Sequence, residues 1–394
     1  MDLLRNVCKY VYLAGAGNCW YENVYQESRG YQMYSVLTFS VYTAMIFLEN
    51  LAALCGKFPE VEKNSAVMFA AIHNIVLTKM FLLLYHKKSI RELNFEMSTV
   101  GENFEEEHVM KKQYRKTKIG IGLYIISVYL SLISYGVESA RRSIVEGAPF
   151  YTVVTYLPFY DDDSLTAFVL RVFFYITWLY MMLPMISADC MPITHLIAMT
   201  CKFVTLCHHY ERIRTEFDIN VLAMDRKEAV DKLKSGCVEG IRMHQKLLLT
   251  ATANLNPRAQ GGPYFSRRGF VNSQLSPHLD LVNAFMTYTF VGSLFLLLAL
   301  NLWNAGELTY QASLLSNAMF NCGWHLCKFE REARRDIRRL VLIGCAQAQK
   351  PLILKAFGIQ DLSYETFVLV KNKMLSILKY FTLGAIHKLQ YKNV

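Results

Sequence analysis

The chain has 394 residues, of which 53% are hydrophobic and 19% are charged. Soluble proteins carry charge on about a quarter of their residues, so this composition favours a membrane protein with polar regions outside the lipid. The formal net charge of +10 comes from Lys and Arg placed between apolar stretches, which is typical of membrane proteins and argues against nucleic-acid binding.

Ten cysteines are present without a Cys-x-x-Cys pair, and Cys322, His325 and Cys327 lack a fourth ligand at suitable spacing. We therefore expect no metal site and no cofactor. The sequence has no nucleophile elbow, phosphate-binding loop or zinc-protease motif, so we do not expect an enzyme.

Five stretches are long and apolar enough to cross a membrane, and a sixth of near-spanning length follows close to the C-terminus. They are residues 34–56, 65–85, 119–140, 165–188 and 279–303, and then 357–385. Residues 1–33 are predicted to form a cytoplasmic segment along the membrane surface. Glu49 lies near the far end of the first span and is expected to reach the lipid headgroups. His73 and Lys79 interrupt the second span, and the sequence names no partner for His73.

The connections are polar. Residues 86–118 are predicted to form a basic loop, and the aspartates 161–163 a solvated turn that starts the next helix. The fourth span is expected to continue as a polar helical region to about residue 246. A charged helix is predicted within residues 310–350, and Pro351 is expected to end it, because proline cannot donate to a helix ladder.

Lys and Arg are unevenly distributed among these connections. Their numbers are eight in 86–118, nine in 202–246 and eight in 304–357, against two in 57–64 and two in 136–164. Because basic connections stay in the cytoplasm, the N-terminus is predicted to be cytoplasmic. This orientation is opposite to that of G-protein-coupled receptors, and the Asp-Arg-Tyr and Asn-Pro-x-x-Tyr motifs of those receptors are absent from the expected positions.

The C-terminal region carries a string of residues in fixed order around the charged helix. The residues are Ser313, Ala318, Phe320, Trp324, Gln349, Lys350, Pro351, Leu362, Ser363 and Phe367. This string resembles the C-terminus of the insect odorant receptor family. Leu157, Pro158 and Phe159 resemble the same family's loop before its fourth span.

The resemblance implies an all-α, polytopic membrane helix bundle of the seven-span insect chemoreceptor type. It further implies an odour-gated cation channel, a heterotetramer of tuning subunits with a shared co-receptor subunit, in the plasma membrane of a sensory dendrite. The expected partners are small volatile odorants, the co-receptor and membrane lipid. The implied domains are a ligand-binding bundle (1–303), a cytoplasmic anchor region (304–356) and a pore-lining last helix with a tail (357–394).

The family binds odorants in the outer half of the bundle, which implies a set of candidate lining residues. They are Phe69, His73, Tyr129, Ile133, Phe174, Trp178, Met286 and Tyr288. Aromatic rings give a large contact area, methionine adapts to shape, and one or two donors orient a ligand with few polar groups. Packing between helices is the competing role for each of them.

The resemblance also implies residues for the pore and for contacts between subunits. The pore or gate positions are Ser376, Tyr380 and Leu383, and the subunit-anchor positions are Ser313, Trp324, Gln349 and Lys350. The two alternatives to an odorant receptor are a gustatory-type receptor channel and a non-channel polytopic membrane protein such as a transporter. A gustatory-type receptor channel usually carries a Thr-Tyr and Gln-Phe ending, which is absent, and a transporter usually shows internal repeats, which we do not find.

Residues 249–277 depart from the family pattern where its fifth span belongs. They contain Pro257, Gly261, Gly262, Pro263 and three arginines, and they have no apolar run. Backbone groups freed by such residues would be unsatisfied in hydrocarbon, so one crossing is missing. Our hypothesis is a retained intron, an alternative exon or a faulty gene model, and the alternative is a re-entrant loop buried among other helices.

Overall fold

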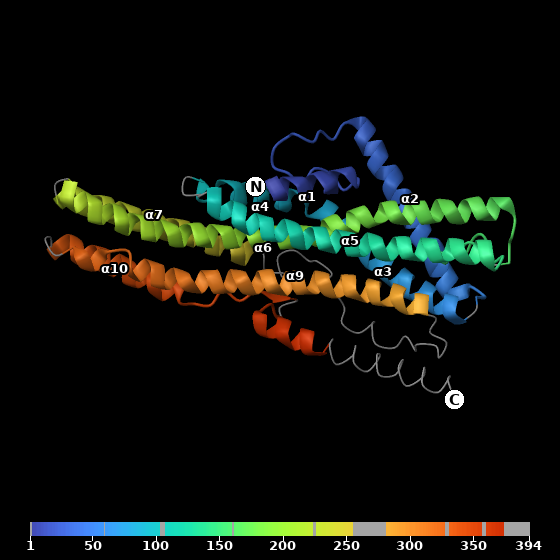
Figure 1. The fold of residues 1–394 in the computed structure, drawn as a ribbon. Helices are drawn as coiled ribbons and strands as arrows, with labels where there is room; N and C mark the ends of the chain where they lie inside the picture. Colours follow the sequence, from blue (N-terminus) through green and yellow to red (C-terminus); the bar gives the residue numbers. More distant parts are fainter. Residues whose placement is uncertain are drawn as a thin grey trace, which may run out of the picture. The chain divides into compact units, whose positions relative to one another are not determined.

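The chain is seen here as a computed structural model. It describes all residues except 1, 59, 103–106, 160, 224–225, 255–280, 328–330, 357–359 and 374–394. The described residues form long helices, as Figure 1 shows. They also form one two-stranded antiparallel sheet, β1 (Lys355–Ala356) and β2 (Gln360–Asp361). The predicted all-α class is confirmed.

The helices have the following bounds: α1 (Asp2–Leu13), α2 (Arg29–Cys55), α3 (Glu60–Tyr85), α4 (Lys87–Thr99), α5 (Glu107–Val145), α6 (Leu165–Ala223), α7 (Arg226–Asn254), α9 (Leu281–Phe320), η2 (Trp324–Leu326) and α10 (Arg331–Ala348). A further helix covers residues 364–373. Five helices are long and apolar enough to cross a membrane within the described residues. They match the five predicted spans up to 303, whereas the predicted span 357–385 is described only in part.

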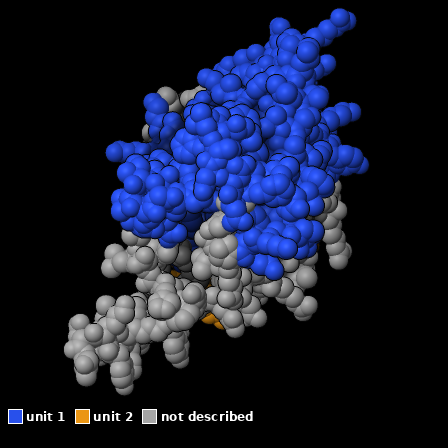
Figure 2. All heavy atoms as spheres, turned by 90° about the vertical axis from the view of Figure 1, so that its right-hand side faces the viewer, with its two compact units in different colours: residues 1–102, 107–198, 259–297 blue, residues 103–106, 199–258, 298–394 orange. Residues whose placement is uncertain are grey.

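The chain divides into two compact units, coloured separately in Figure 2. Unit 1 comprises residues 1–102, 107–198 and 259–297, and unit 2 comprises 103–106, 199–258 and 298–394. Each of α6 and α9 contributes to both units. The units are groups of packed residues, so the three implied functional domains remain predictions.

The core of unit 1 is built from α2, α3 and α6. Tyr42 and Ile46 of α2 pack with Val76 and Met80 of α3 and with Met181 of α6. Positions four residues apart lie on one face of a helix, so each helix presents a continuous apolar stripe to its neighbours. Ser28 caps the start of α2 by accepting a hydrogen bond from the Tyr31 backbone N–H, which places the helix start before the predicted residue 34.

The predicted loop 86–118 was wrong, because most of its described residues are helical. Residues 87–99 form α4, whose buried face carries Ile90, Leu93, Asn94 and Met97. The Asn94 side chain donates to the Cys19 carbonyl at 2.8 Å and its oxygen lies 2.7 Å from Nε2 of His195. The high charge of the segment lies on the other face of an amphipathic helix, which composition alone does not distinguish from a loop.

The N-terminal segment packs against the rest of unit 1, and its predicted position along the membrane surface remains a prediction. The apolar side chains of Leu4, Val7 and Val11 on α1 are buried. Glu27 holds the segment to α4, because both of its carboxylate oxygens lie 2.8 Å from Nζ of Lys87. Burial alone would raise the pKa of Glu27, but hydrogen bonds from Lys87 and the Asn18 backbone N–H outweigh it, and the pKa is lowered.

In unit 2 the end of α6 packs against α7. Figure 1 shows α7 and α10 side by side. Two glycines of α7 let α6 approach closely. A Cβ atom added to Gly240 would lie 2.6 Å from Tyr210, and one added to Gly236 would lie 2.9 Å from Ile213. The spacing Gly-x-x-x-Gly places both glycines on one helix face, which brings the two backbones together.

The helix that holds the predicted span 279–303 extends beyond it. Residues 304–320 continue α9 without a break, and the charged helix predicted within 310–350 is α10, Arg331–Ala348. The turn between them begins at Gly323, whose φ of 99° lies in the left-handed region that favours glycine. The predicted stop at Pro351 is confirmed, since α10 ends at Ala348.

Candidate functional site

A buried polar group lies among the helices of unit 1. His73 of α3 places Nδ1 2.6 Å from Oε2 of Glu49 on α2, and Trp178 of α6 donates its indole N–H to Nε2 of His73 at 2.8 Å. Glu49 and His73 are fully buried and Trp178 is 1% exposed. We call these three residues the Glu49–His73–Trp178 triad. The expectation that Glu49 reaches the headgroups was wrong, and His73, which had no partner in the sequence analysis, has two.

The two hydrogen bonds of His73 determine which nitrogen of its imidazole carries the proton. An indole N–H can only donate, so Nε2 of His73 accepts and the proton lies on Nδ1, which donates to Glu49. The imidazole in this arrangement is neutral. The negative charge of an ionised Glu49 is therefore not cancelled by His73.

Two polar atoms beside the triad have no hydrogen-bond partner among the described residues. They are Oε1 of Glu49 and the hydroxyl of Tyr42. Tyr42 lies seven residues before Glu49 on α2, which is two helical turns on the same face, and its ring centroid is 6.3 Å from that of His73. A buried polar atom without a partner costs about 1–3 kcal/mol, and more when it is charged.

Aromatic rings surround the triad in unit 1. Phe69 is centred 5.1 Å from Trp178 in an edge-to-face contact and 6.1 Å from His73. The ring centroid of Phe69 lies 5.7 Å from that of Tyr135 on α5 and 6.5 Å from that of Phe290 on α9. The group thus combines one carboxylate with an apolar aromatic surface, a pattern that suits a small, largely apolar ligand with one polar end.

The structure brings together three of the eight candidate ligand-binding residues, namely Phe69, His73 and Trp178. Ile133 is 49% exposed on α5. Tyr129 and Phe174 are half-buried, and in the described part of the chain neither makes a ring contact or hydrogen bond with the triad. Met286 and Tyr288 lie in α9, but their side chains are outside what the structure describes.

Sequence reasoning missed Glu49, Tyr42, Tyr135 and Phe290. A signal for Glu49 was present, because a carboxylate within an apolar span is expensive and therefore calls for a partner. His73 lies 24 residues later, on the neighbouring helix of a hairpin, at a comparable depth. The aromatic residues gave no such signal, since helix rotation decides which of many rings face inward.

The loop before α6 is held by a buried arginine. Arg171 donates to the hydroxyl of Tyr151 at 2.9 Å and to the carbonyls of Phe159 and Asp162 at 3.0 and 2.9 Å. The Asp162 carboxylate accepts from the Ser164 backbone N–H at 2.9 Å, one residue before α6 begins. The predicted turn and helix start at the three aspartates is confirmed.

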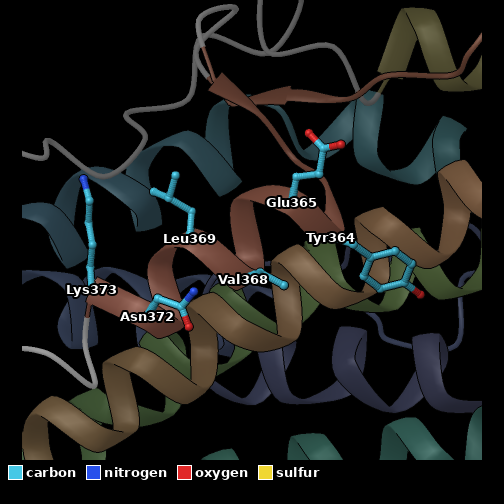
Figure 3. A pocket seen from close by; sticks show the side chains of 6 residues that line it. All are labelled: Tyr364, Glu365, Val368, Leu369, Asn372 and Lys373. Carbon is cyan, nitrogen blue, oxygen red and sulfur yellow. The ribbon is translucent and has the colours of Figure 1, made fainter.

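In unit 2 the helix 364–373 docks on α9. The hydroxyl of Tyr364 donates to Oε2 of Glu307 at 2.5 Å, and the Tyr364 ring meets Trp303 edge-on at 5.3 Å. A Cβ atom on Gly306 would lie 2.8 Å from the Tyr364 ring, so a glycine is needed for this approach. Six residues of this helix line a pocket of about 750 Å³: Tyr364, Glu365, Val368, Leu369, Asn372 and Lys373. Figure 3 shows Glu365, Leu369 and Lys373 on one side of the helix.

The four anchor candidates lie in unit 2. Ser313, Gln349 and Lys350 are exposed and line a cavity of about 450 Å³ between the end of α9 and the segment after α10. Trp324 donates its indole N–H to the Phe320 carbonyl at 3.0 Å. The guanidinium carbon of Arg338 lies over the Trp324 ring, 5.9 Å from its centroid. The pore candidates Ser376, Tyr380 and Leu383 lie outside the described residues.

The cysteines form no metal centre in the described part of the chain. Cys237 and Cys322 place their sulfur atoms 3.7 Å apart as free thiols.

One comparison with known proteins identifies the family. The profile described as 7tm Odorant receptor matches residues 60–257 and 269–374, which is more than half of the chain. The match omits residues 258–268, inside the segment where the sequence departs from the family pattern. It favours the odorant-receptor resemblance over the gustatory-type and transporter alternatives. Among curated protein sequences, none matches this chain.

Solved structures show the same fold. The insect olfactory receptor OR5 from Machilis hrabei in complex with eugenol has a TM-score of 0.68 at 12% identity, covering 95% of this chain and 96% of that one. The structure of OR5 described without a ligand has a TM-score of 0.66 at 12% identity, covering 96% and 97%. At this identity the similarity establishes the helical architecture.

Proposed function

This chain belongs to the 7tm odorant receptor family, and we propose that it is an odour-tuning subunit of a ligand-gated cation channel. It is a multi-pass membrane receptor and not an enzyme. The observation that carries the proposal is the buried triad with its aromatic surroundings, inside a bundle with the fold of OR5, one structure of which is a complex with eugenol.

The ligand is a small volatile molecule that binds among α2, α3, α5, α6 and α9. Phe69 and Trp178 supply aromatic contact area, and His73 and Glu49 supply the polar end of the site. Tyr129, Ile133, Phe174, Met286 and Tyr288 complete the set of proposed lining residues. Since the lining comes from five helices, binding changes how those helices pack against one another.

The proposed route from ligand to pore runs along α9. This helix carries Phe290 beside the aromatic group and, further on, Trp303 and Glu307, which hold the start of the helix 364–373. α9 is continuous from Leu281 to Phe320, so in this proposal a small shift at the aromatic group is passed along the helix. Ser376, Tyr380 and Leu383, which lie outside the described residues, line the pore in this proposal.

The channel is proposed to be a heterotetramer with the insect odorant co-receptor subunit, in the plasma membrane, with the N-terminus in the cytoplasm. The excess of basic residues in 86–118, 202–246 and 304–357 supports this orientation. The exposed residues Ser313, Gln349 and Lys350, together with Trp324, supply the contacts between subunits.

The test is current measured in cells that express this chain with and without the co-receptor subunit, across a panel of odorants. We expect odour-evoked cation current only when both subunits are present. Absence of current at every odorant, both from the full chain and from a variant that lacks residues 258–268, with the chain detected at the cell surface, would contradict the proposal. Replacement of Tyr380 by Ala in the same cells is expected to alter gating or permeation while surface expression persists.

The same assay addresses the atypical segment. A variant that lacks residues 258–268, the part outside the family match, is compared with the full chain. Current recovered only in the shortened variant supports an origin of the segment in splicing or gene prediction. Equal currents support a tolerated insertion.

A further inference from the structure

We propose that Glu49 and Tyr42 form a subsite that selects ligands with a hydrogen-bond donor, and that protonated amines occupy it most tightly. The inference rests on the proposed odour-receptor function and deepens it by naming the chemical class of ligand. It concerns Oε1 of Glu49 and the hydroxyl of Tyr42, which are buried, lie beside His73 and have no hydrogen-bond partner among the described residues.

The first argument is geometric. Glu49 and Tyr42 are both fully buried and lie on the same face of α2, two turns apart. Oε2 of Glu49 is already bound by His73 at 2.6 Å, which fixes the carboxylate and leaves Oε1 as the open acceptor. A carboxylate oxygen accepts hydrogen bonds only, so the group that completes the site must bring an N–H or O–H.

The second argument is electrostatic. The indole N–H of Trp178 donates to Nε2 of His73, so the imidazole is neutral and does not cancel a charge on Glu49. Two cations of α3 and α6 in this unit, Lys79 and Arg171, are engaged elsewhere. Lys79 pairs with Asp189 at 2.5 Å, and Arg171 binds Tyr151 and two loop carbonyls. An ammonium group supplies both the missing donor and the missing positive charge, whereas a hydroxyl supplies only the donor.

The third argument concerns the rest of the ligand. Phe69, Tyr135, Trp178 and Phe290 provide aromatic surface around the triad. Aromatic faces accept an apolar chain and also attract a cation within about 6 Å of the ring centre. The site therefore suits a short apolar body that ends in one amine or hydroxyl group.

The experiment compares hexylamine, hexanol and methyl pentyl ether, which have equal numbers of non-hydrogen atoms and differ in their donors. Concentration–response curves are recorded in cells that express the full chain with the co-receptor subunit. We expect hexylamine to act at the lowest concentration, then hexanol, with the ether weaker than hexanol by roughly tenfold to a hundredfold.

Two variants assign the preference to the subsite. Glu49→Gln preserves the shape of the side chain and removes its charge, so the advantage of the amine over the alcohol is expected to disappear. Tyr42→Phe removes a hydroxyl that lacks a partner, so the protein is expected to be at least as thermally stable without ligand, while the donor ligands lose potency relative to the ether. Tyr85→Phe, at an exposed tyrosine of α3, is the matched control and should change nothing.

The outcomes separate this inference from the proposed function. If the ether is as potent as the amine and the alcohol, or if Tyr42→Phe shifts all three ligands equally, an internal water fills the site and the inference is wrong. The receptor function still stands in that case, because the ether evokes current. Phe69→Leu is expected to weaken all three ligands together, which marks the shared apolar part of the site.

Discussion

Nζ of Lys79 on α3 lies 2.5 Å from Oδ1 of Asp189 on α6, and the hydroxyl of Tyr124 on α5 donates to the other oxygen of Asp189 at 3.0 Å. The side chains of Lys79 and Asp189 are 24% and 8% exposed. The ion pair and the hydrogen bond from Tyr124 together link three membrane-spanning helices of unit 1, α3, α5 and α6. Lys79, which interrupts the predicted second span, therefore has a structural role.

Removal of one partner of this pair is expected to destabilise the protein strongly. Lys79→Met leaves the buried carboxylate without its counter-charge, at a cost of roughly 3–5 kcal/mol. The measurement is thermal unfolding in detergent together with surface expression. Lys88→Met, at an exposed position of the next helix, is the control and is expected to have little effect.

The reversed pair tests the electrostatic origin. Lys79→Asp combined with Asp189→Lys is expected to recover part of the lost stability. If the double variant is no more stable than either single variant, the pair does not act through its charges.

The close approach of α6 and α7 is expected to require glycine at position 240. In Gly240→Ala the new Cβ meets Tyr210 at 2.6 Å, and such overpacking costs about 1–3 kcal/mol. Gly122→Ala on α5 is the matched control, because a Cβ there meets nothing within 4 Å. Alanine also has a higher helix propensity than glycine, by about 1 kcal/mol. Equal melting temperatures for the two variants would contradict the packing argument.

The contact between Tyr364 and Glu307 is expected to set the sensitivity of the channel. Tyr364→Phe removes a hydrogen bond to a carboxylate, worth about 1.5–3 kcal/mol. If this contact differs between closed and open states, the half-maximal odorant concentration shifts by roughly tenfold or more. Tyr310→Phe on α9 is the control, since this residue is 52% exposed. An unchanged concentration–response curve for Tyr364→Phe would show that the contact does not take part in gating.

The proposed orientation predicts which cysteine reacts from outside the cell. Cys55, at the end of α2, is exposed, Cys207 is half-buried, and the other eight cysteines are buried. Burial also raises the pKa of the Cys19 thiol to about 12, which keeps it protonated and unreactive at neutral pH.

A membrane-impermeant maleimide applied to intact cells is therefore expected to label the wild type and not the Cys55→Ser variant. Labelling of Cys55 only after permeabilisation would place the N-terminus outside the cell and overturn the orientation.

The contact between Glu27 and Lys87 is expected to make stability depend on pH. The folded pKa of Glu27 is lowered, so its contribution is present above the unfolded pKa of about 4.3 and is lost as pH falls through the folded value. Because the pair is partly exposed, the effect is on the order of 1 kcal/mol. Unfolding followed between neutral and acidic pH should show a smaller loss in Glu27→Gln than in the wild type. Parallel pH profiles for the two proteins would count against the contact.

The sequence by itself determined the class, the family and the positions of the five spans up to residue 303. These properties depend on local quantities, namely the length of apolar runs, the distribution of Lys and Arg, and a string of residues at fixed spacing. The same local quantities gave a wrong prediction at α4, where the high charge of residues 86–118 was interpreted as a loop. They also did not show that α9 continues past the predicted span to Phe320.

The tertiary structure alone decided which residues meet. Glu49 is bound to His73 instead of the headgroups, and Phe290 lies beside Phe69. Gly240 of α7 lies against Tyr210 of α6. Each of these contacts depends on the rotation of one helix about its axis relative to another. Apolar spans show almost no periodic difference between their faces, so the packing of neighbouring helices sets that rotation and the sequence pattern does not.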